Sequence, residues 1–519
     1  MSNREHSRLK IVSIVIIITL IGKVTGLGRD MLMGHTFGTG LEADALATAI
    51  QIPRHFFDAI FASAISASFI PVFNEVLTRE GRAEADRLAS SFFTVVGLVA
   101  ATLTFLGMVF APQLVNLMAT HFDQERAALA AHLLRIIFPS LFFTGMAFSM
   151  VGMLNSFGEF NIPAAMSVAS NGILIVYFLF FVPYFGVYGA AAALLIGWAA
   201  QAAMQIPSLR KKGYRYRPRW RPHPGLKKIF RLMLPVMVST WIHPINMFVS
   251  IRFASALPGG VASLTLANGL YIMIAGIFVL SVTNVIFPEM SRLSASGDRA
   301  TFCNMVRSTI QTLLFLLLPM TVGLMILATP VVQLLYEYRQ FDAHSTALMA
   351  AALFFLSLGM VGFGVQNVLL RAFYAEKNGK IPLLAGLVGI LVNLILARLL
   401  VGPMGVAGLA LAAACSLLTA TAVLIPPAHG MLGRNLITGS LAKALGKMLC
   451  AALIMGALVF FLRDLLTVAL GQGIFARLVL VGAPALLGIA VYLILAYLLR
   501  MEEFRYISNL IRKRRKEAS

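Results

Sequence analysis

Long apolar stretches alternate with short polar ones along the whole chain of 519 residues. A helix that crosses a bilayer needs about 20 mostly apolar residues, and fourteen stretches reach that length. The predicted spans are 11–33, 48–74, 90–112, 133–155, 163–183, 188–208, 232–256, 266–288, 308–330, 347–371, 382–401, 406–427, 442–462 and 476–499. We therefore predict an all-α integral membrane protein with about 14 transmembrane helices, and both termini on one side of the membrane.

The two halves of this pattern resemble each other. The matching segments, in the same order, are 70–71 with 287–288, Gly81 with Gly297, 161–163 with 380–382, and 185–192 with 404–411. A repeat of six spans keeps both copies in one orientation, related by a pseudo-two-fold axis along the membrane normal. The predicted parts are an N-terminal lobe (1–212), a basic linker (213–231), a C-terminal lobe (232–430), and two final helices with a basic tail (431–519).

Composition supports the membrane assignment. Hydrophobic residues make up 59% of the chain and charged residues 12%, whereas soluble domains carry about 45–50% and about 25%. This composition excludes a disordered chain, a secreted disulfide scaffold and most soluble enzymes. Cys303, Cys415 and Cys450 lie far apart in or beside apolar segments, so neither a disulfide framework nor a metal site is indicated.

The net charge of +21 comes from 42 Lys and Arg against 21 Asp and Glu. Of these cations, 32 of 42 lie at the termini and in the even-numbered connections between spans. The positive-inside rule then predicts that both termini are cytoplasmic, in the inner membrane of a bacterium. The basic stretch 209–231 is interpreted as a linker lying on anionic lipid head groups, and no nucleic-acid partner is predicted.

Four more cations lie in or beside the odd-numbered connections, and the six that remain of the 42 are deeper in the predicted spans. Arg135 and Arg398 lie near span ends, where a long side chain reaches the interface. The remaining four are interpreted as a substrate-binding set: Lys23, Arg29, Arg54 and Arg252. Because a charge at membrane depth costs at least about 2.5–3.5 kcal/mol, such residues usually face a cavity or a partner. Arg and Lys both suit phosphate groups, so an anionic, amphipathic ligand is expected.

Polar residues recur at helical spacing beside these cations. On the second span they are Asp44, Thr48, Gln51, His55 and Asp58, and on the seventh they are Ser239, His243, Asn246 and Ser250. We interpret both stripes as the lining of a water-filled cleft. The acids Asp30, Asp44 and Asp58 are predicted to pair with the cations in one state and release them in another.

Three glycines interrupt the first span: Gly22, Gly26 and Gly28. They are predicted to form a flexible hinge, since a glycine-rich membrane helix can bend beside a cavity. The chain contains no Walker loop, no HExxH and no GxSxG. No catalytic residue, cofactor or metal is therefore predicted.

The run Gly26-Leu-Gly-Arg29-Asp30, Phe37-Gly-Thr-Gly40, Ala43-Asp44-Ala45 and Ile52-Pro53, with Phe69-Ile-Pro71, resembles the MurJ/MviN family. These proteins are lipid II flippases of the multidrug/oligosaccharidyl-lipid/polysaccharide exporter superfamily. The resemblance implies two lobes, alternating access, and movement of lipid II from the inner to the outer leaflet for peptidoglycan synthesis. It also implies energy from the membrane potential or an ion gradient, a groove for the polyprenyl tail at the final two helices, and partners in the cell-wall synthesis machinery.

Position by position, Arg29, Asp30 and Asp44 match the family pattern directly. Lys23 stands where the family usually has Arg, while Phe57 and Gly269 stand where it has cavity arginines. Arg54 and Arg252 are the expected substitutes for those two.

Other functions stay open at this stage. One is export of another polyprenyl-linked oligosaccharide, and another is cation-coupled drug export, which would favour acids over cations in the cavity. A membrane-embedded transferase or a scaffold of the cell-wall machinery is a third. The transferase would need an acid–base group at the interface, and the sequence offers no strong candidate.

Overall fold

The structure is a computed structural model that describes residues 3–54, 59–219, 222–240, 242–432, 439–471 and 473–504. Every regular element in these ranges is a helix, so the predicted all-α class is confirmed. The helices are α1 (Asn3–Phe37), α2 (Leu41–Pro53), α3 (Ala59–Arg79), α4 (Arg82–Val109), α5 (Ala111–Met118), α6 (Gln124–Ile137), α7 (Ser140–Ser156), α8 (Asn161–Val176), η2 (Tyr177–Phe181), α9 (Val182–Ala203), α10 (Ile206–Lys211), α11 (Gly225–Thr240), α12 (Ile242–Ala254), α13 (Gly260–Ser296), α14 (Arg299–Leu335), α15 (Ala343–Leu358), α16 (Met360–Ala375), α17 (Lys380–Leu432), α18 (Gly439–Ala469) and α19 (Ile474–Leu498).

Among the described residues, eight helical stretches are long and apolar enough to cross a membrane. The count rises to nine if α15 and α16, which meet at a bend of 46°, form one span. Two of the eight are 51 and 52 residues long, about twice the length that one crossing needs. The predicted total of fourteen spans stays a prediction.

Both of these long stretches break at a glycine. Gly186 has φ 51 and ψ −143, and Gly405 has φ 58 and ψ −133. Residues with a Cβ avoid this region, so glycine allows the chain to reverse here without strain. The two glycines occupy the same position in the matching segments 185–192 and 404–411, between predicted spans five and six and between eleven and twelve. The sequence repeat therefore coincides with a repeat in backbone conformation.

Helix caps repeat in the same register. The Asp123 side chain accepts a hydrogen bond from the Arg126 amide at 2.8 Å and begins α6. The Asp342 side chain accepts one from the Ser345 amide at 2.8 Å and begins α15. An alignment of the two copies on Gly186 and Gly405 also pairs Asp123 with Asp342. A carboxylate at this position satisfies an amide that the helix itself leaves unpaired.

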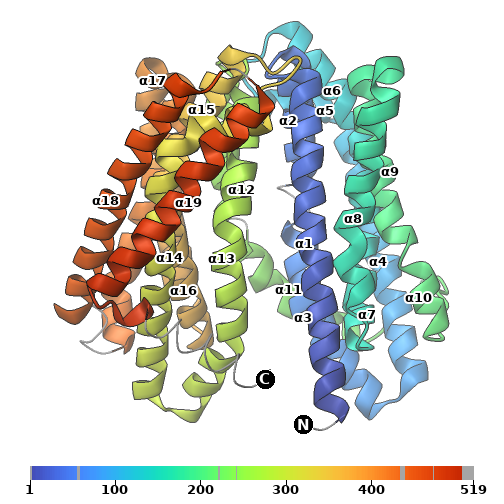
Figure 1. The fold of residues 1–519 in the computed structure, drawn as a ribbon. Helices are drawn as coiled ribbons and strands as arrows, with labels where there is room; N and C mark the ends of the chain where they lie inside the picture. The colour runs from blue at the N-terminus through green and yellow to red at the C-terminus, as the bar shows by residue number, and fades with distance from the viewer. Residues whose placement is uncertain are drawn as a thin grey trace. The chain divides into compact units, whose positions relative to one another are not determined.

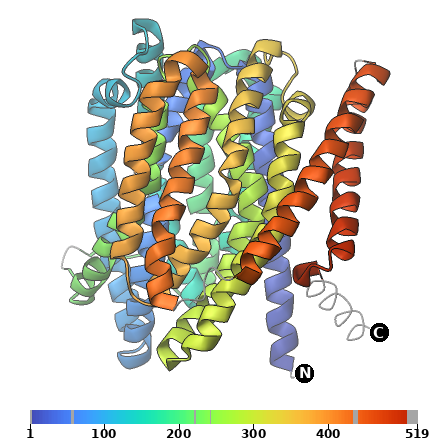
Figure 2. The same ribbon diagram turned by 90° about the vertical axis from the view of Figure 1, so that its left-hand side faces the viewer.

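Packing divides the chain into two compact units, Met1–Ala262 and Ser263–Ser519. In the first unit α8 packs between α1 and α9, and α3 packs against α7 and α11 (Figure 1). In the second, α14 packs against α15, α18 and α19, and the red C-terminal helices α18 and α19 also contact each other (Figure 2). This division places α11 and α12 with the first unit, and the predicted lobe boundaries at 212 and 232 stay a prediction.

The even-numbered connections of the first unit meet one another. The Lys228 ammonium lies 2.5 Å from the Glu75 carboxylate, and His223 Nε2 donates to the Glu84 carboxylate at 3.0 Å. The Arg82 guanidinium lies 4.1 Å from the centroid of the Phe157 ring. The hydrogen bond and charge of Lys228 hold the pKa of the Glu75 carboxyl below its usual range. These contacts bring connections two, four and six to one side, as alternating spans require.

The second unit follows the same rule. Ser294 and Glu376, from connections eight and ten, are joined by a hydrogen bond of 2.7 Å. Arg477 and Glu337, beside the odd-numbered connections thirteen and nine, form an ion pair of 2.7 Å. Within each unit, therefore, these contacts join even-numbered connections to even-numbered ones and odd-numbered connections to odd-numbered ones.

Candidate functional site

Arg29, of the predicted binding set, forms three side-chain hydrogen bonds. Its Nε and Nη2 donate to Asp30 Oδ1 at 2.9 and 2.6 Å. Neighbouring residues on a helix point in different directions, so this pair forms because the long Arg29 side chain folds back around α1. Both side chains are 27% exposed. Each therefore stays accessible to a ligand while its charge is compensated.

Asn171 on α8 holds the other edge of the Arg29 guanidinium. Arg29 Nη1 donates to Asn171 Oδ1 at 3.0 Å, and Asn171 Nδ2 donates to the Gly22 carbonyl oxygen at 3.1 Å. The Asn171 side chain is buried. The predicted binding set omitted this residue, although a single amide in the apolar run 163–183 was a visible signal.

The glycines of α1 serve two purposes in this structure. A Cβ at Gly22 would overlap Ser167 Oγ, and one at Gly26 would lie 3.3 Å from Asn171 Nδ2. Both therefore let α1 and α8 approach closely, as small residues do in membrane helix pairs. A Cβ at Gly28 would meet nothing within 4 Å. The α1 helix is continuous through all three, so the predicted hinge stays a prediction.

Lys23 and Arg54 occupy exposed positions. Lys23 is exposed on α1, and no hydrogen bond or ion pair joins its ammonium to the part of the chain that the structure describes. Asp30, seven residues further along α1, pairs with Arg29. Arg54 follows α2 and is exposed. Both side chains are therefore accessible to a ligand.

Asp44 lies in an enclosed polar site of the first unit. Its side chain is fully buried and accepts hydrogen bonds from the Gly259 and Ala262 amides at 2.9 and 2.8 Å. These amides lie at the N-terminal turn of α13, where a negative charge is stabilised by the helix dipole. Arg126 Nη1 lies 3.5 Å from Asp44 Oδ2. The carboxylate thus ties α2, α6 and the start of α13 together.

Arg252 lies beside the same group of connections. Its Nη1 donates to the Leu117 carbonyl oxygen at 3.1 Å, at the C-terminal end of α5. The Ser255 hydroxyl accepts from the His121 amide at 3.3 Å. A cation at a helix C-terminus is stabilised by the dipole. This contact accounts for Arg252 without a ligand, and its predicted role in binding stays a prediction.

The two polar stripes are described in part. Thr48 and Gln51 are buried on α2, while His55, Phe57 and Asp58 lie outside the described residues. Ser239 belongs to α11, and His243, Asn246 and Ser250 belong to α12. Ser250 is buried, and its hydroxyl donates to the Asn246 carbonyl oxygen at 3.3 Å.

The first unit thus holds Arg29 on α1 between polar side chains of α1 and α8. A guanidinium held on two sides keeps donors that can form a fork with a phosphate oxygen pair. No group of three or more His, Cys, Asp or Glu side chains within the described residues could hold a metal ion. The arrangement suits recognition of an anion.

Known proteins share the sequence over most of its length. The family described as lipid II flippase MurJ matches residues 33–481. The chain is 28% identical over 515 residues to the probable lipid II flippase MurJ of Rhizobium tropici, and the match covers 96% of both chains. It is 29% identical over 490 residues to the corresponding protein of Thermotoga maritima, covering 94% of this chain and 96% of that relative.

Solved structures share the fold. A structure of lipid II flippase MurJ in an inward closed conformation matches with a TM-score of 0.80 and 26% identity, over 93% of this chain and 98% of that one. An inward-facing multidrug resistance MATE transporter of the MOP superfamily matches with a TM-score of 0.66 over 81% of this chain and 98% of that one; at 18% identity it shows the fold alone. Because the family match extends over most of the sequence, the chain belongs to the lipid II flippase MurJ family.

Proposed function

We propose that this protein is a lipid II flippase. It moves the undecaprenyl-pyrophosphate-linked peptidoglycan precursor from the inner to the outer leaflet of the bacterial inner membrane by alternating access. The observation that carries the proposal is the family match over residues 33–481, together with an arginine held in a polar site on α1.

Arg29 and Lys23 receive the pyrophosphate in this proposal. The Arg29 guanidinium is already oriented by Asp30 and Asn171, so little side-chain entropy is lost when it binds. A pyrophosphate bound at the remaining guanidinium donors competes with Asp30 for the positive charge of Arg29. The state in which Asp30 releases Arg29 is therefore favoured by the ligand, which is how differential contacts shift a conformational equilibrium.

Arg54 and Arg252 are assigned supporting roles, and Asp44 with Asp58 is assigned to gating. Asp44 is suited to this because its contacts join three elements through a single carboxylate. Separating α2, α6 and the start of α13 would require the two hydrogen bonds and the ion pair of Asp44 to break together. The membrane potential or an ion gradient is the proposed energy source, and the cell-wall synthesis machinery is the proposed partner. The chain acts as a transporter rather than an enzyme.

The test uses purified full-length protein in proteoliposomes. Translocation of lipid II is compared with that of another polyprenyl-diphosphate glycan, for the unaltered protein and for Arg29→Ala, Lys23→Ala and the double variant. We expect lipid II to be preferred and Arg29→Ala to lower its rate about 10- to 100-fold, as loss of a charge-assisted contact predicts.

Lys380→Ala is the matched control, because Lys380 is a cation at the start of α17 in the second unit. It should leave the rate unchanged. In cells depleted of their own flippase, the double variant should reach the membrane and fail to support growth. Full growth with both cations replaced would contradict the assigned roles, whereas preference for the other glycan would contradict the substrate.

A further inference from the structure

One arginine in the first unit joins three even-numbered connections. Arg82 begins α4 at connection two, and its Nη2 donates to the Lys212 carbonyl oxygen at 3.0 Å. Its guanidinium also lies 4.1 Å from the centroid of the Phe157 ring. Lys212 follows α10 in connection six, and Phe157 follows α7 in connection four. We call these three residues the Arg82 clasp.

The second unit has a similar arrangement around Arg299, the first residue of α14, at connection eight. Its Nη1 donates to the Met431 carbonyl oxygen at 2.9 Å, at the end of α17. Its Nη2 lies 3.6 Å from Glu376 Oε2, just after α16 in connection ten. We call these three residues the Arg299 clasp. In both clasps an arginine satisfies a carbonyl oxygen at a helix end, where intrahelical partners are missing.

Each member of the Arg82 clasp has its counterpart in the Arg299 clasp. The offset is 217 residues for the arginines, as for 70–71 and 287–288, and 219 for the other two pairs, as for the two reversing glycines. The paired positions are Arg82 with Arg299, Phe157 with Glu376, and Lys212 with Met431. Because the contacts recur together with the positions, they belong to the scaffold that the two copies share.

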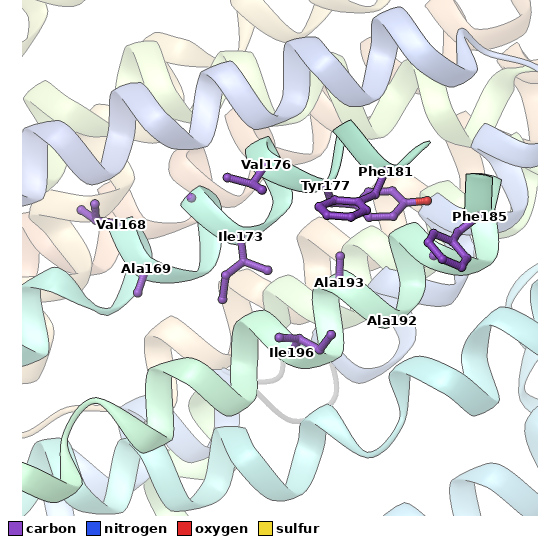
Figure 3. Close-up of a pocket in the computed structure, with 12 residues that line it drawn as sticks. Val168, Ala169, Ile173, Val176, Tyr177, Phe181, Phe185, Ala192, Ala193 and Ile196 are labelled. Atoms are coloured by element: carbon purple, nitrogen blue, oxygen red, sulfur yellow. The ribbon is translucent and has the colours of Figure 1, made fainter. Parts of the chain in front are cut away.

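Such agreement is not general between the copies. An apolar groove of about 680 Å³ lies between α8 and α9, and Figure 3 shows its lining side chains coming from α8, η2 and α9. Gly172 and Ala192 belong to this lining, whereas their counterparts at the offset of 219 are Leu391 and Leu411. Side-chain size at these positions thus changes from one copy to the other, while the clasp contacts are retained.

The two clasps differ in how the guanidinium is oriented. In the first, the acid is Asp86 on the same helix, 3.0 Å from Arg82 Nε, and connection four contributes an aromatic ring. In the second, Cys303 stands at the position of Asp86, and the acid is Glu376 of connection ten. The ion pair therefore lies within one helix in the first unit and between two connections in the second.

Neutral hydrogen bonds reinforce the Arg82 clasp. Just beyond it along the chain, the hydroxyls of Tyr214 and Tyr216 form hydrogen bonds of 3.0 Å with Ser90 and Thr94 on α4. At the corresponding positions, 433–435, the second copy carries no aromatic residue. Connection six is thus tied to α4 by contacts that need no ion pair, and these contacts have no counterpart in the second copy.

The Arg299 clasp depends more on charge. The side chains of Arg299 and Glu376 are 69% and 21% exposed. Ser294 donates to Glu376 Oε1 at 2.7 Å, so the carboxylate is fixed and the long arginine is the mobile partner. Salt screens an exposed pair, because the Debye length falls from about 10 Å at 0.1 M to about 3 Å at 1 M. Screening therefore removes the charge that orients Arg299 toward α17.

We infer that the Arg82 and Arg299 clasps are equivalent conformational locks, of which only the second is released by ionic strength. Each holds the end of the last predicted span of its copy to the start of the third. That end is where the chain leaves the repeat, for the basic linker in one copy and for α18 in the other. This inference goes beyond the proposed function, because it concerns backbone motion in the absence of substrate.

The experiment measures amide hydrogen exchange of the full chain in lipid nanodiscs by mass spectrometry, at 0.1 M and 1 M sodium chloride. Each rate is divided by that of an unstructured reference peptide in the same buffer. We expect the end of α17, residues 428–432, to exchange about two- to fivefold faster at 1 M salt, as loss of an exposed ion pair allows. Residues 208–216, at the Arg82 clasp, should exchange at the same rate in both buffers.

Three substitutions separate charge from shape. Glu376→Gln keeps an oxygen for Ser294, so it should speed exchange at the end of α17 in 0.1 M salt by the same factor and abolish the salt response. Glu289→Gln is the matched control, because Glu289 pairs with Arg292 on its own helix, and it should change neither rate. Glu376→Phe gives the second clasp the ring of the first, and should restore slow exchange that salt does not alter.

Equal salt responses at the two clasps, no response at the end of α17, or a response that survives in Glu376→Gln would each overturn the inference. Arg82→Ala should speed exchange of residues 208–216 in both buffers, and an unchanged rate there would show that the clasps are not equivalent. Thermal unfolding confirms that the variants fold, and the comparison of the two buffers needs no variant. Failure to transport lipid II would contradict the proposed function and leave these exchange rates as they are.

Discussion

The α8–α9 hairpin of the first unit and α17 of the second are two copies of one pattern. Both reverse at a glycine with positive φ, Gly186 and Gly405. They differ in what surrounds the reversal. The first passes through the π-helical turn η2 and carries Gly172 and Ala192. The second is α-helical up to its glycine and, in the alignment on Gly186 and Gly405, carries Leu391 and Leu411 at those positions. The repeat thus preserves the reversal of the chain and varies the surfaces beside it.

The same contrast holds for charge. Gly38 and Gly259 both have positive φ, one in each half of the sequence pattern. An alignment on these two glycines pairs Arg29 with Ser250 and Asp30 with Ile251. Arg29, the cation to which we assign pyrophosphate binding, therefore has no charged counterpart in the second copy, although the backbone turn after it recurs in both.

The largest effect on stability is expected at Asp44. Asp44→Ala removes a fully buried acceptor from two amides and from Arg126. Leaving a buried charge without its partner costs about 3–5 kcal/mol. Thermal unfolding in detergent should show a large loss, and Glu337→Ala, at the partly exposed ion pair of the second unit, should show a much smaller one. Equal losses would mean that Asp44 is no more central than a surface pair.

The reversals give a matched pair of substitutions. Gly186→Ala and Gly405→Ala each force a Cβ into a backbone region that costs about 1–3 kcal/mol. At Gly186 a Cβ would meet nothing within 4 Å, so the loss would come from the backbone alone. Gly402→Ala, inside α17, is the control and should be neutral or stabilising. Thermal unfolding measures the stability of all three variants. Unequal losses of stability at Gly186 and Gly405 would show that the two reversals are not equivalent.

Asn171 tests whether the polar support of Arg29 matters for transport. In the alignment on Gly186 and Gly405 its counterpart is Ile390, so Asn171→Ile copies the second unit. Losing the hydrogen bond to the guanidinium should raise the lipid II concentration at half-maximal rate about tenfold, or about 1.4 kcal/mol. The maximal rate should change little. Asn171→Asp keeps the acceptor and should restore binding. A variant that loses only thermal stability would point to a purely structural role.

The caps should show the smallest effects. Asp123→Ala and Asp342→Ala each remove one side-chain acceptor at a helix start, which costs about 1 kcal/mol. Because the residues lie in different units, their losses should add in the double variant. Chemical unfolding monitored by intrinsic fluorescence measures all three. A loss in one copy alone would show that the caps are not equivalent.

Much of the fold was predictable. Runs of apolar residues indicated helices at membrane depth, and the short matching segments indicated a repeat whose backbone copies then appeared at Gly186 and Gly405. Lys23, Arg29 and Asp44 stood out because charge is rare in such runs. Helical periodicity, however, puts Asp30 on the same face as Lys23, seven residues away, and Arg29 on a different face. Side-chain flexibility decided otherwise, since Arg29 folds back onto its neighbour.

The sequence by itself determined that the chain is helical and membrane-embedded, where the chain reverses, and which few charges are unusual. These features follow from local hydrophobicity, glycine conformation and rarity of charge, all of which act over a few residues. Only the tertiary structure decided that Asn171 holds Arg29, that Asp44 caps α13, and that Gly172 and Ala192 form one groove. Such contacts join residues up to 218 positions apart, because helix packing selects partners by distance in space and not along the chain.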